Sequence, residues 1–184
     1  MATRDIVIER VRVLLQDEDP SAYVFPTSVL QHFADEGLRT ISPVVGRLTT
    51  TLVAADGSTR EFDLSAQLSG EVLQVAAVIS DESLVWEAYG DTLAVKPVPS
   101  QDFEVRALVG FTEIVEAPER VADALVYYCS GRSLLWLTNR GGDALGRYLA
   151  QQGELENHDV SKMGEEYLRE YYTRREECGV SVAV

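Results

Sequence analysis

The spacing of apolar and polar residues changes twice along the chain, from a helical period to strict alternation and back. Residues 4–16 follow the helical period, with polar side chains on one face and apolar side chains on the other, which predicts an amphipathic helix. The polar face consists of Asp5, Glu9, Arg12 and Gln16, and the apolar face consists of Val7, Val11 and Leu14.

A second helix is predicted to begin after Pro26, and a later proline stops it. Ser28 together with Gln31 fits a capping box at its start, and Thr27 is an alternative cap. Gly37 interrupts this helix, at a cost of about 1 kcal/mol relative to alanine. It either lets another helix approach closely or is incidental, and the sequence leaves both readings open.

From residue 49 onward apolar and polar side chains alternate, as expected for half-buried antiparallel strands. Asp56-Gly57 stands between two such runs and predicts a β-hairpin. Pro97 and Pro99 cannot donate hydrogen bonds to a ladder, so they mark a loop or a sheet edge. The expected strands, which make a small sandwich or a curled sheet, are 50–54, 59–64, 71–80, 84–89, 92–96 and 103–111.

The helical period returns after Pro118, a residue suited to a first helical position. Helices are predicted over 119–137, 144–152 and 159–177. We therefore predict an α+β fold: a helical bundle with an inserted antiparallel β lobe. Its parts are a helical domain of residues 1–48 and 118–177, a β insertion of residues 49–117 and a tail of residues 178–184. The residues expected in the helical core are Leu14, Phe33, Leu125 and Leu135.

The chain of 184 residues is strongly acidic, with a formal net charge of −14. Residues 51–117 hold 12 acids against three bases, so most of the excess lies in the predicted β insertion. A negative surface repels phosphate groups, which argues against ordinary binding to nucleic acid. The charge either serves solubility or keeps a surface that lies near DNA from adhering to it.

The composition indicates a globular protein that is made in the cytosol. No apolar run is long enough to cross a bilayer, and the first residues lack the basic-then-apolar pattern of a secretory signal. Cys129 and Cys178 lie far apart, so they match neither a disulfide framework nor a metal site.

Residues that usually carry chemistry are scattered. His32 and His158 each stand alone, whereas a metal site needs several converging ligands. Cys129 lies on an apolar helix and is expected to be a core residue. The acidic run 17–20 lacks the glycine and the glutamate that a calcium loop requires downstream, and Gly141-Gly142 follows a helix rather than the strand of a phosphate loop. We expect no enzymatic activity, no cofactor and no metal.

Three stretches of the chain carry the pattern of a known family. Residues 26–37 combine a polar cap with an amphipathic helix that ends near a proline. Residues 86–99 read W-x-x-Y-x-D-x-L-x-V-x-P-x-P, an aromatic residue and an acid followed by a strand that leads into Pro-x-Pro. Residues 118–136 form a helix with D-A-L-V-Y-Y followed by Arg132. In this order, over most of residues 4–177, they resemble the bacteriophage head–tail adaptor (connector) proteins.

The resemblance implies a structural protein that forms a dodecameric ring under the portal of a tailed phage. Such a ring continues the DNA channel and carries the next neck, stopper or tail protein. Double-stranded DNA would pass through it without specific binding, and no membrane would be involved. The protein would be made in the host cytoplasm and end at the head–tail junction of the virion.

Two groups of residues are candidates for these contacts. The end of the last helix and the apolar tail beyond it are expected to dock on the portal or on a neighbouring subunit, because small β-branched residues can extend a sheet edge or fill a groove. These docking candidates are Tyr171, Tyr172, Arg174, Arg175, Val180, Val182 and Val184. Acids of the β insertion are expected to line the channel, and the candidates are Asp81, Glu82, Asp91 and Asp102.

Two other classes of function compete with the adaptor. Trp86 and Tyr89 on one strand suit a small β module that binds a peptide or a carbohydrate, although aromatic residues more often belong to a core. A divergent enzyme would have to assemble its site from the scattered acids of the β insertion. The oligomeric state separates these hypotheses, because a binding module is expected to be a monomer and an adaptor to form a ring.

Overall fold

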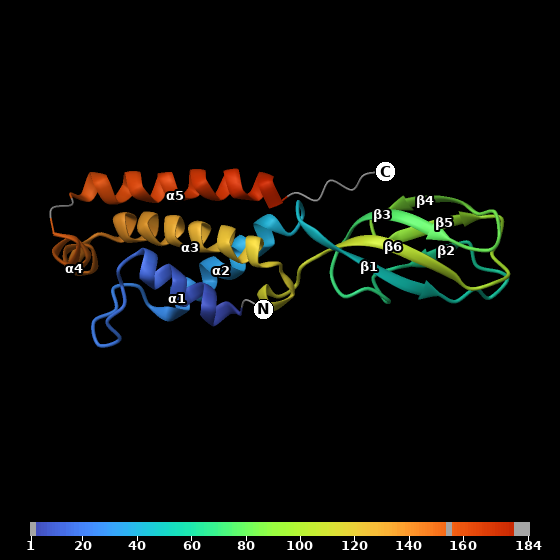
Figure 1. Cartoon of the computed structure of the whole chain (residues 1–184), viewed down its shortest axis with the longest axis horizontal. Coiled ribbons are helices and arrows are strands. Elements are labelled where there is room, and N and C mark those ends of the chain that lie inside the picture. The colour runs from blue at the N-terminus through green and yellow to red at the C-terminus, as the bar shows by residue number, and fades with distance from the viewer. Residues whose placement is uncertain (1–2, 154–155, 179–184) are drawn as a thin grey trace. The chain divides into compact units, whose positions relative to one another are not determined.

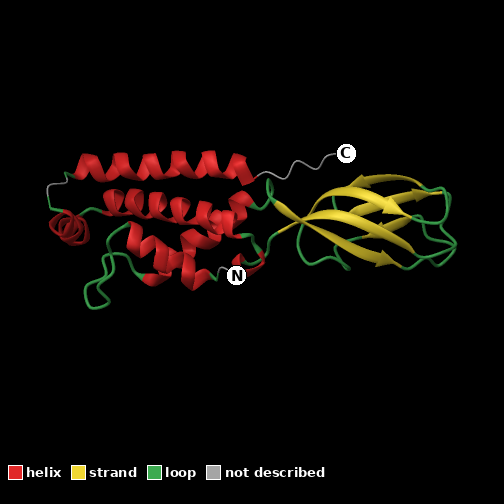
Figure 2. Cartoon of the chain, in the orientation of Figure 1, coloured by secondary structure: helices red, strands yellow, loops and turns green. Residues whose placement is uncertain are grey.

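The computed structural model describes residues 3–153 and 156–178 (Figure 1). They form an α+β fold, as predicted, which divides into two compact units. The helical unit contains the described residues up to Ile41 and from Glu113 onward, and the β unit is Ser42–Thr112 (Figure 2). Each unit has its own core.

The helical unit is organised around one central helix. Its elements are α1 (Arg4–Leu14), α2 (Thr27–Ile41), the 3-10 turn η1 (Ile114–Glu116), α3 (Glu119–Arg140), α4 (Gly142–Gln152) and α5 (Asn157–Cys178). The helices α1, α2 and α5 each pack against α3. Buried residues therefore occupy most of the circumference of α3, among them Val121, Leu125, Cys129 and Leu134.

The core of the helical unit confirms the predicted burial of Phe33 and Leu125. The predicted burial of Leu14 and Leu135 is wrong, because both side chains are only half-buried. In each case the neighbouring leucine is buried instead. On α1 the reason is local, since the C-cap Leu15 keeps helical backbone angles and lies four residues after the buried Val11, on the same side of the helix.

The largest departure from the predicted pattern is Arg12, which is buried and does not lie on an exposed polar face. Its guanidinium donates to Asp17 Oδ2 at 2.6 Å, to Thr27 Oγ1 at 3.0 Å and to the Phe25 carbonyl at 3.2 Å. The ring centre of Tyr23 lies 3.4 Å from its central carbon. These partners all follow α1 in the chain, so periodicity within the helix gives no sign of them.

At two helices the residues around the first turn take other roles than the capping signals predict. The first residue of α2 is Thr27, so neither Thr27 nor Ser28 is its N-cap. Pro118 is the N-cap of α3, and Glu119 takes the first helical position. Such ends depend on the packing around them and shift by one or two residues between equivalent descriptions.

Glycine permits two close contacts between helices. A Cβ atom at Gly37 of α2 would lie 2.8 Å from Tyr128 Cδ1 and 3.0 Å from Leu125 Cδ2 of α3. The close approach that the sequence left open is therefore what Gly37 provides. A Cβ atom at Gly131 of α3 would lie 2.8 Å from the Gly164 carbonyl oxygen of α5. Real Cβ atoms do not approach other atoms this closely, so glycine is required at both crossings.

Replacing Gly131 with valine is expected to lower the free energy of unfolding by about 1–3 kcal/mol, because the new methyl groups collide with α5. Urea unfolding followed by circular dichroism measures this loss. Gly146 of α4 is the matched control, because a Cβ atom there meets nothing within 4 Å. Gly146→Ala should stabilise the protein by up to about 1 kcal/mol. A Gly131→Val variant as stable as the wild type would show that the two helices do not approach closely.

The β unit is a small sandwich of two three-stranded antiparallel sheets. One sheet has the order β1 (Gly46–Val53), β6 (Phe103–Gly110), β3 (Val72–Ile79). The other has the order β2 (Glu61–Asp63), β5 (Thr92–Lys96), β4 (Val85–Tyr89). The inner faces of both sheets share one core, which includes Val53, Phe62, Val75, Leu93, Phe103 and Val105.

The hairpin predicted at Asp56-Gly57 is wrong, because the flanking strands β1 and β2 belong to different sheets. The turn itself is present. Asp56 accepts hydrogen bonds from the Thr59 hydroxyl and N–H, both at 2.6 Å, and from the Ser58 N–H at 2.7 Å, and these bonds hold the pKa of Asp56 well below its ordinary value. Gly57 has a φ of +71°. The same turn chemistry here carries the chain from one sheet to the other.

The two ends of the β unit lie side by side. Gly46 at the start of β1 pairs with Gly110 at the end of β6, and the Ser42 hydroxyl donates to the Phe111 carbonyl at 3.2 Å. The first strand thus begins earlier in the chain than the expected start near residue 50. The chain leaves the helical unit after α2 and comes back to it through adjacent residues, which is the connectivity of an insertion.

Candidate functional site

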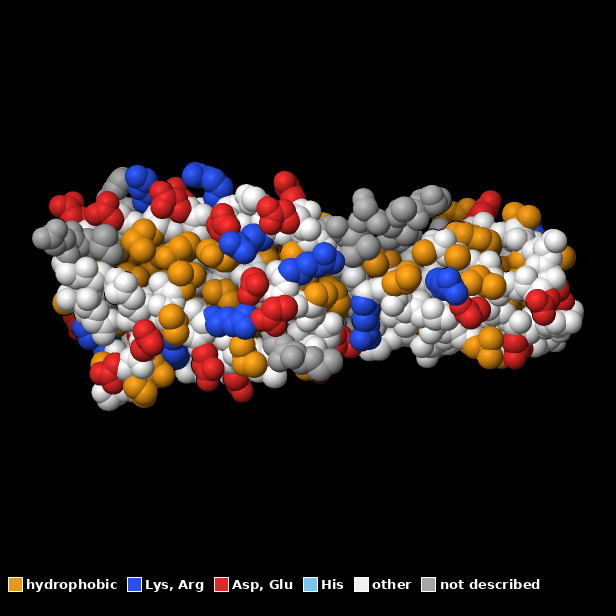
Figure 3. Space-filling model, in the orientation of Figure 1, with side chains coloured by type: hydrophobic (Ala, Val, Ile, Leu, Met, Phe, Trp, Pro, Cys, Tyr) orange, Lys and Arg blue, Asp and Glu red, His pale blue; other side chains and the backbone are white. Residues whose placement is uncertain are grey.

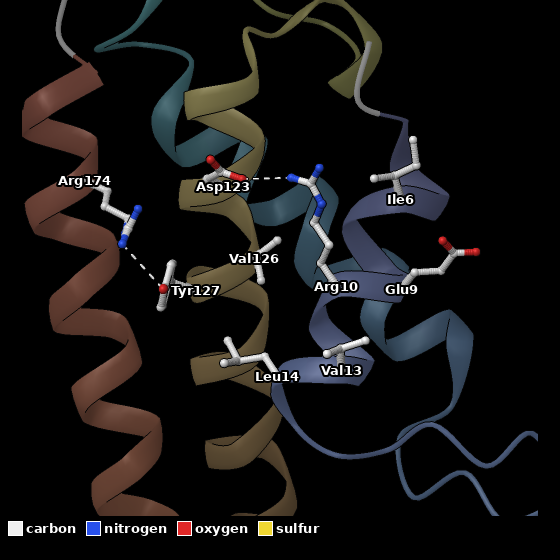
Figure 4. A pocket seen from close by; sticks show the side chains of 9 residues that line it. All are labelled: Ile6, Glu9, Arg10, Val13, Leu14, Asp123, Val126, Tyr127 and Arg174. Carbon is white, nitrogen blue, oxygen red and sulfur yellow. Dashed lines mark hydrogen bonds and ion pairs between the residues drawn. The ribbon is translucent and has the colours of Figure 1, made fainter.

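The helical unit has an open groove between α1 and α5, with α3 as its floor (Figure 4). Its volume is about 620 Å³. Val126 and Tyr127 of α3 form the apolar floor, and Ile6, Val13 and Leu14 line the α1 side. Figure 3 shows hydrophobic side chains gathered in this part of the helical unit. We call this surface the helical groove.

Ion pairs occupy the polar part of the helical groove (Figure 4). Arg10 contacts two carboxylates of α3, Asp123 at 2.8 Å and Glu119 at 2.5 Å. Arg174 donates to a glutamate one turn earlier on α5 at 2.7 Å and to the hydroxyl of the floor tyrosine at 3.4 Å. Glu9, the other acid that lines the groove, is exposed. Because both arginines are already paired, the groove offers apolar area to an occupant.

The outer face of the β1-β6-β3 sheet is apolar and close to neutral. Leu48 and Leu52 of β1 and Ile79 of β3 are exposed. Between these strands, Arg106 and Glu104 of β6 form an ion pair at 3.1 Å. Figure 3 shows hydrophobic side chains around one basic and one acidic side chain on this side of the β unit. We call the surface of these five residues the apolar sheet face.

The outer face of the second sheet has a different character. Glu87 and Tyr89 of β4 are exposed, and the Tyr89 hydroxyl donates to Glu87 at 2.8 Å. Glu61 and Asp63 of β2 are exposed as well, and Lys96 of β5, opposite Val85 of β4, is an exposed base of the same sheet. One outer face of the sandwich is therefore acidic, with Val85 and Tyr89 exposed beside the acids, and the other outer face is apolar and close to neutral.

The four acids predicted to line a channel are not gathered in one place. Glu82 accepts from the N–H and the hydroxyl of Ser100, and the hydroxyl above all lowers the pKa of Glu82. Asp91 accepts the backbone N–H at the start of β3 at 3.1 Å, Asp102 accepts a loop N–H at 2.9 Å, and Asp81 is exposed. Asp91 is bound to the start of β3, whereas Asp81 and Glu82 follow its end. Three of the four thus hold loops in place, and the set does not converge on a substrate-sized site.

Tyr171 does not fit its predicted role in partner binding, because its side chain is fully buried. Its ring lies 4.8 Å from the ring of Tyr128, and burial raises the pKa of Tyr171 to about 12. Tyr171 lies on the face of α5 that packs against α3. Tyr171 is therefore a core residue of the helical unit.

The other docking candidates on α5 remain accessible to different degrees. Tyr172 is exposed, and Arg175 is half-buried. Arg174 lies over the ring of Tyr127, with its central carbon 4.4 Å from the ring centre, as part of the helical groove. The remaining candidates, Val180, Val182 and Val184, lie outside the described residues.

The aromatic strand does not form a flat binding surface. Trp86 points inward and packs against the core of the sandwich, whereas Tyr89 points outward. This follows from the alternation of side chains along β4, since residues 86 and 89 are separated by an odd number of positions. A ligand on the outer face would therefore meet Tyr89 without Trp86.

Cys129 is a core residue, as predicted. Its thiol lies 3.3 Å from the Leu30 carbonyl, and burial raises the pKa of Cys129 to about 12, so the reactive thiolate is suppressed. His32 is exposed, and the side chain of His158 lies outside what the structure describes. Within the described residues no group of histidine, cysteine and acidic side chains is arranged to hold a metal ion. The same residues contain no helix with the length and apolar character of a membrane span.

Sequence reasoning missed both the helical groove and the apolar sheet face. A signal for each was present. Val13 lies outside the predicted apolar stripe of α1, and Leu48 and Leu52 lie on the side of β1 opposite to Val53, which is in the core. An apolar residue left over on the face away from the core is a sign of a partner surface when several occur together.

The chain matches no protein-family model, and no curated protein matches it.

Proposed function

We propose that this protein is a structural head–tail adaptor of a tailed bacteriophage. Copies of the chain form a ring, dodecameric by the resemblance, beneath the portal. The ring extends the DNA channel and carries the next neck, stopper or tail protein. In this role the functional parts of the molecule are its assembly surfaces rather than a catalytic site.

One observation carries this proposal: a β-sandwich is inserted between α2 and α3 of a helical unit in which α1, α2 and α5 pack on α3. This is the order of elements that the resemblance implies. The first and last strands of the insertion pair with each other, so the chain leaves and re-enters the helical unit through adjacent residues. Each unit therefore keeps its own fold and supplies its own surface. Separate surfaces suit a subunit that must contact neighbours and a partner at the same time.

The charge of the β unit supports passage of DNA. Residues 42–112 hold ten acids against four bases, and Glu61, Asp63 and Glu87 lie on one outer face. A duplex facing such a surface is repelled, so it slides without adhering. The acids Asp81 and Asp102 stay candidates for the same lining because both are exposed.

A monomeric module that binds a peptide or carbohydrate is the weaker alternative. It would use the exposed side of β4, but Trp86 is turned into the sandwich core. Tyr89 alone, held by Glu87, offers one aromatic ring to a ligand. No geometry on this strand favours the module over the adaptor.

The decisive experiment measures the mass of the purified chain by sedimentation, alone and with the portal protein of the same phage, and images the particles by electron microscopy. The adaptor proposal expects closed rings whose opening admits duplex DNA, seated coaxially on the portal. A protein that stays monomeric in both samples, or that forms a closed dimer, would contradict the proposal.

A second test concerns charge. Duplex DNA should not bind detectably at physiological salt by fluorescence anisotropy, because a chain with a net charge of −14 releases no counterions from the duplex. Glu61→Lys, Asp63→Lys and Glu87→Lys together reverse the acidic outer face. This triple variant should gain salt-sensitive DNA binding, and it serves as the positive control. Tight DNA binding by the wild type would contradict the sliding surface.

A further inference from the structure

We propose that subunits join head to tail, with Leu48 and Leu52 of one copy in the helical groove of the next. The inference rests on the proposed ring and names the two surfaces that would build it. One surface belongs to the β unit and the other to the helical unit of a different copy, so the contact needs no particular arrangement of the two units within a chain.

Both surfaces expose more apolar area than a monomer needs. Leu48 and Leu52 are 61% and 66% exposed, although they are large aliphatic residues of a regular strand. Val13 of the helical groove is 58% exposed, beside the apolar floor on α3. Contiguous exposed apolar residues of this kind mark interaction sites.

The two surfaces are similar in length. Leu48 and Leu52 lie on the same side of β1, four residues apart, which places them about 13 Å from each other. Ile6 and Val13 lie seven residues apart on α1, so they are separated by about 10 Å along the groove. Both leucines therefore fit along one groove, with Thr50 between them on the same face.

The two surfaces also match in charge. The outward row of β1, from Gly46 through Leu48 and Thr50 to Leu52, is uncharged. In the helical groove, Arg10 and Arg174 are already paired with carboxylates of their own chain. Placing the row in the groove therefore buries apolar area and leaves neither arginine without its partner.

Charge and symmetry together identify the occupant as a second copy. Two molecules with a net charge of −14 repel each other, so they can associate only through surfaces without excess charge, and these two surfaces meet that condition. A contact between two different patches is heterologous, and heterologous contacts close into rings when the rotation per subunit allows it. A contact of the sheet face with itself would instead give a closed dimer.

Two variants test the contact, each altered on one surface only. The sheet-face variant carries Leu48→Glu and Leu52→Glu, and the groove variant carries Ile6→Glu and Val13→Glu. Each should self-associate at least about 100-fold more weakly than the wild type in sedimentation equilibrium, because each lost aliphatic contact is worth roughly tenfold or more in affinity. If the double groove variant does not fold, Val13→Glu alone replaces it, since an exposed position tolerates glutamate.

The matched control places the same charges on the opposite face of the sandwich. Val85 and Tyr89 are 70% and 69% exposed on the outer face of the other sheet. Val85→Glu with Tyr89→Glu adds the same charge to an equally exposed strand, and its self-association should stay within about threefold of the wild type once salt screens the extra charge. Equal melting temperatures of all variants show that the folds are intact.

Mixing the two variants gives the sharpest outcome. The sheet-face variant keeps an intact groove, and the groove variant keeps an intact β1 row, so a mixture has one working interface for each pair of molecules. We expect complexes of one copy of each variant and nothing larger, whereas each variant alone stays monomeric. A sheet-to-sheet contact would instead leave the groove variant fully associated, which would overturn the inference.

The results separate this inference from the adaptor proposal. Rings that persist in both variants would refute this interface and leave the adaptor proposal standing. Paired complexes from the mixture, together with a wild type that forms open chains and no ring on the portal, would support the interface and refute the adaptor. A wild type that is monomeric at every attainable concentration would refute the interface.

Discussion

Replacing Arg12 with alanine is expected to lower the free energy of unfolding by about 3–5 kcal/mol, because it leaves the buried carboxylate of Asp17 without a cation. The side chains of Arg12 and Asp17 are 7% and 1% exposed, so water cannot replace the lost partner. The carbonyl of Phe25 and the hydroxyl of Thr27 lose a donor in the same variant. Urea unfolding at neutral pH measures the effect.

Arg10 is the matched control for this prediction. It lies on the same helix and contacts Glu119 and Asp123, but all three side chains are substantially exposed. Arg10→Ala should cost no more than about 1 kcal/mol, since exposed ion pairs contribute little. Equal losses at Arg10 and Arg12 would show that the Arg12 site is open to solvent.

The loss in Arg12→Ala should depend on pH. Burial already raises the pKa of Asp17 above its ordinary value, against hydrogen bonds from two N–H groups and the pull of Arg12, and removal of Arg12 raises it further. A carboxyl whose pKa is higher in the folded state than in the unfolded state destabilises the fold as pH rises through that range. The deficit should therefore be largest at pH 7 and shrink as the pH falls and Asp17 takes up a proton, which happens above the ordinary range of an aspartate because burial raises its pKa.

Replacing Leu125 with alanine is expected to lower the free energy of unfolding by about 2–5 kcal/mol. Leu125 is fully buried at the crossing of α3 with α2, where its side chain closely approaches the Gly37 backbone. The helices are in contact at this crossing and cannot move closer to fill the space, so a cavity stays behind. Urea unfolding of the same protein sample measures the loss.

Leu135 on the same helix is the control for Leu125. Its side chain is half-buried, so Leu135→Ala should cost about half as much, on the scale of apolar area removed from water. Equal losses at the two positions would mean that the side of α3 that carries Leu135 is covered as fully as the side that carries Leu125.

Local patterns were sufficient for the elements and for the class of fold. The helical period placed α1 and α2 within about two residues and α3 within about three, because apolar residues recur at helical spacing over several turns. Alternation placed β6 in the same way, and the stretch of strands between two sets of helices predicted the inserted β lobe. Each of these features depends on residues that are neighbours in the chain.

Pairing between strands could not be predicted from neighbours. The Asp56-Gly57 turn has the local chemistry of a hairpin, yet β1 pairs with β6 and β2 pairs with β5. A turn fixes the direction of the chain over a few residues, whereas the partner of a strand depends on which distant apolar face shares its core. The same reason explains Arg12, whose carboxylate partner lies beyond the end of its own helix.

The candidate surfaces show the same division. The sequence by itself determined an acidic chain with an inserted β lobe and without a recognisable catalytic motif, because charge and periodicity are properties of the residues alone. Only the tertiary structure decided that Tyr171 is core, that Val13 and Leu52 are exposed, and that the open groove lies between α1 and α5. The exposure of a side chain depends on which other elements pack against it. It is therefore determined only once elements far apart in the chain are in contact.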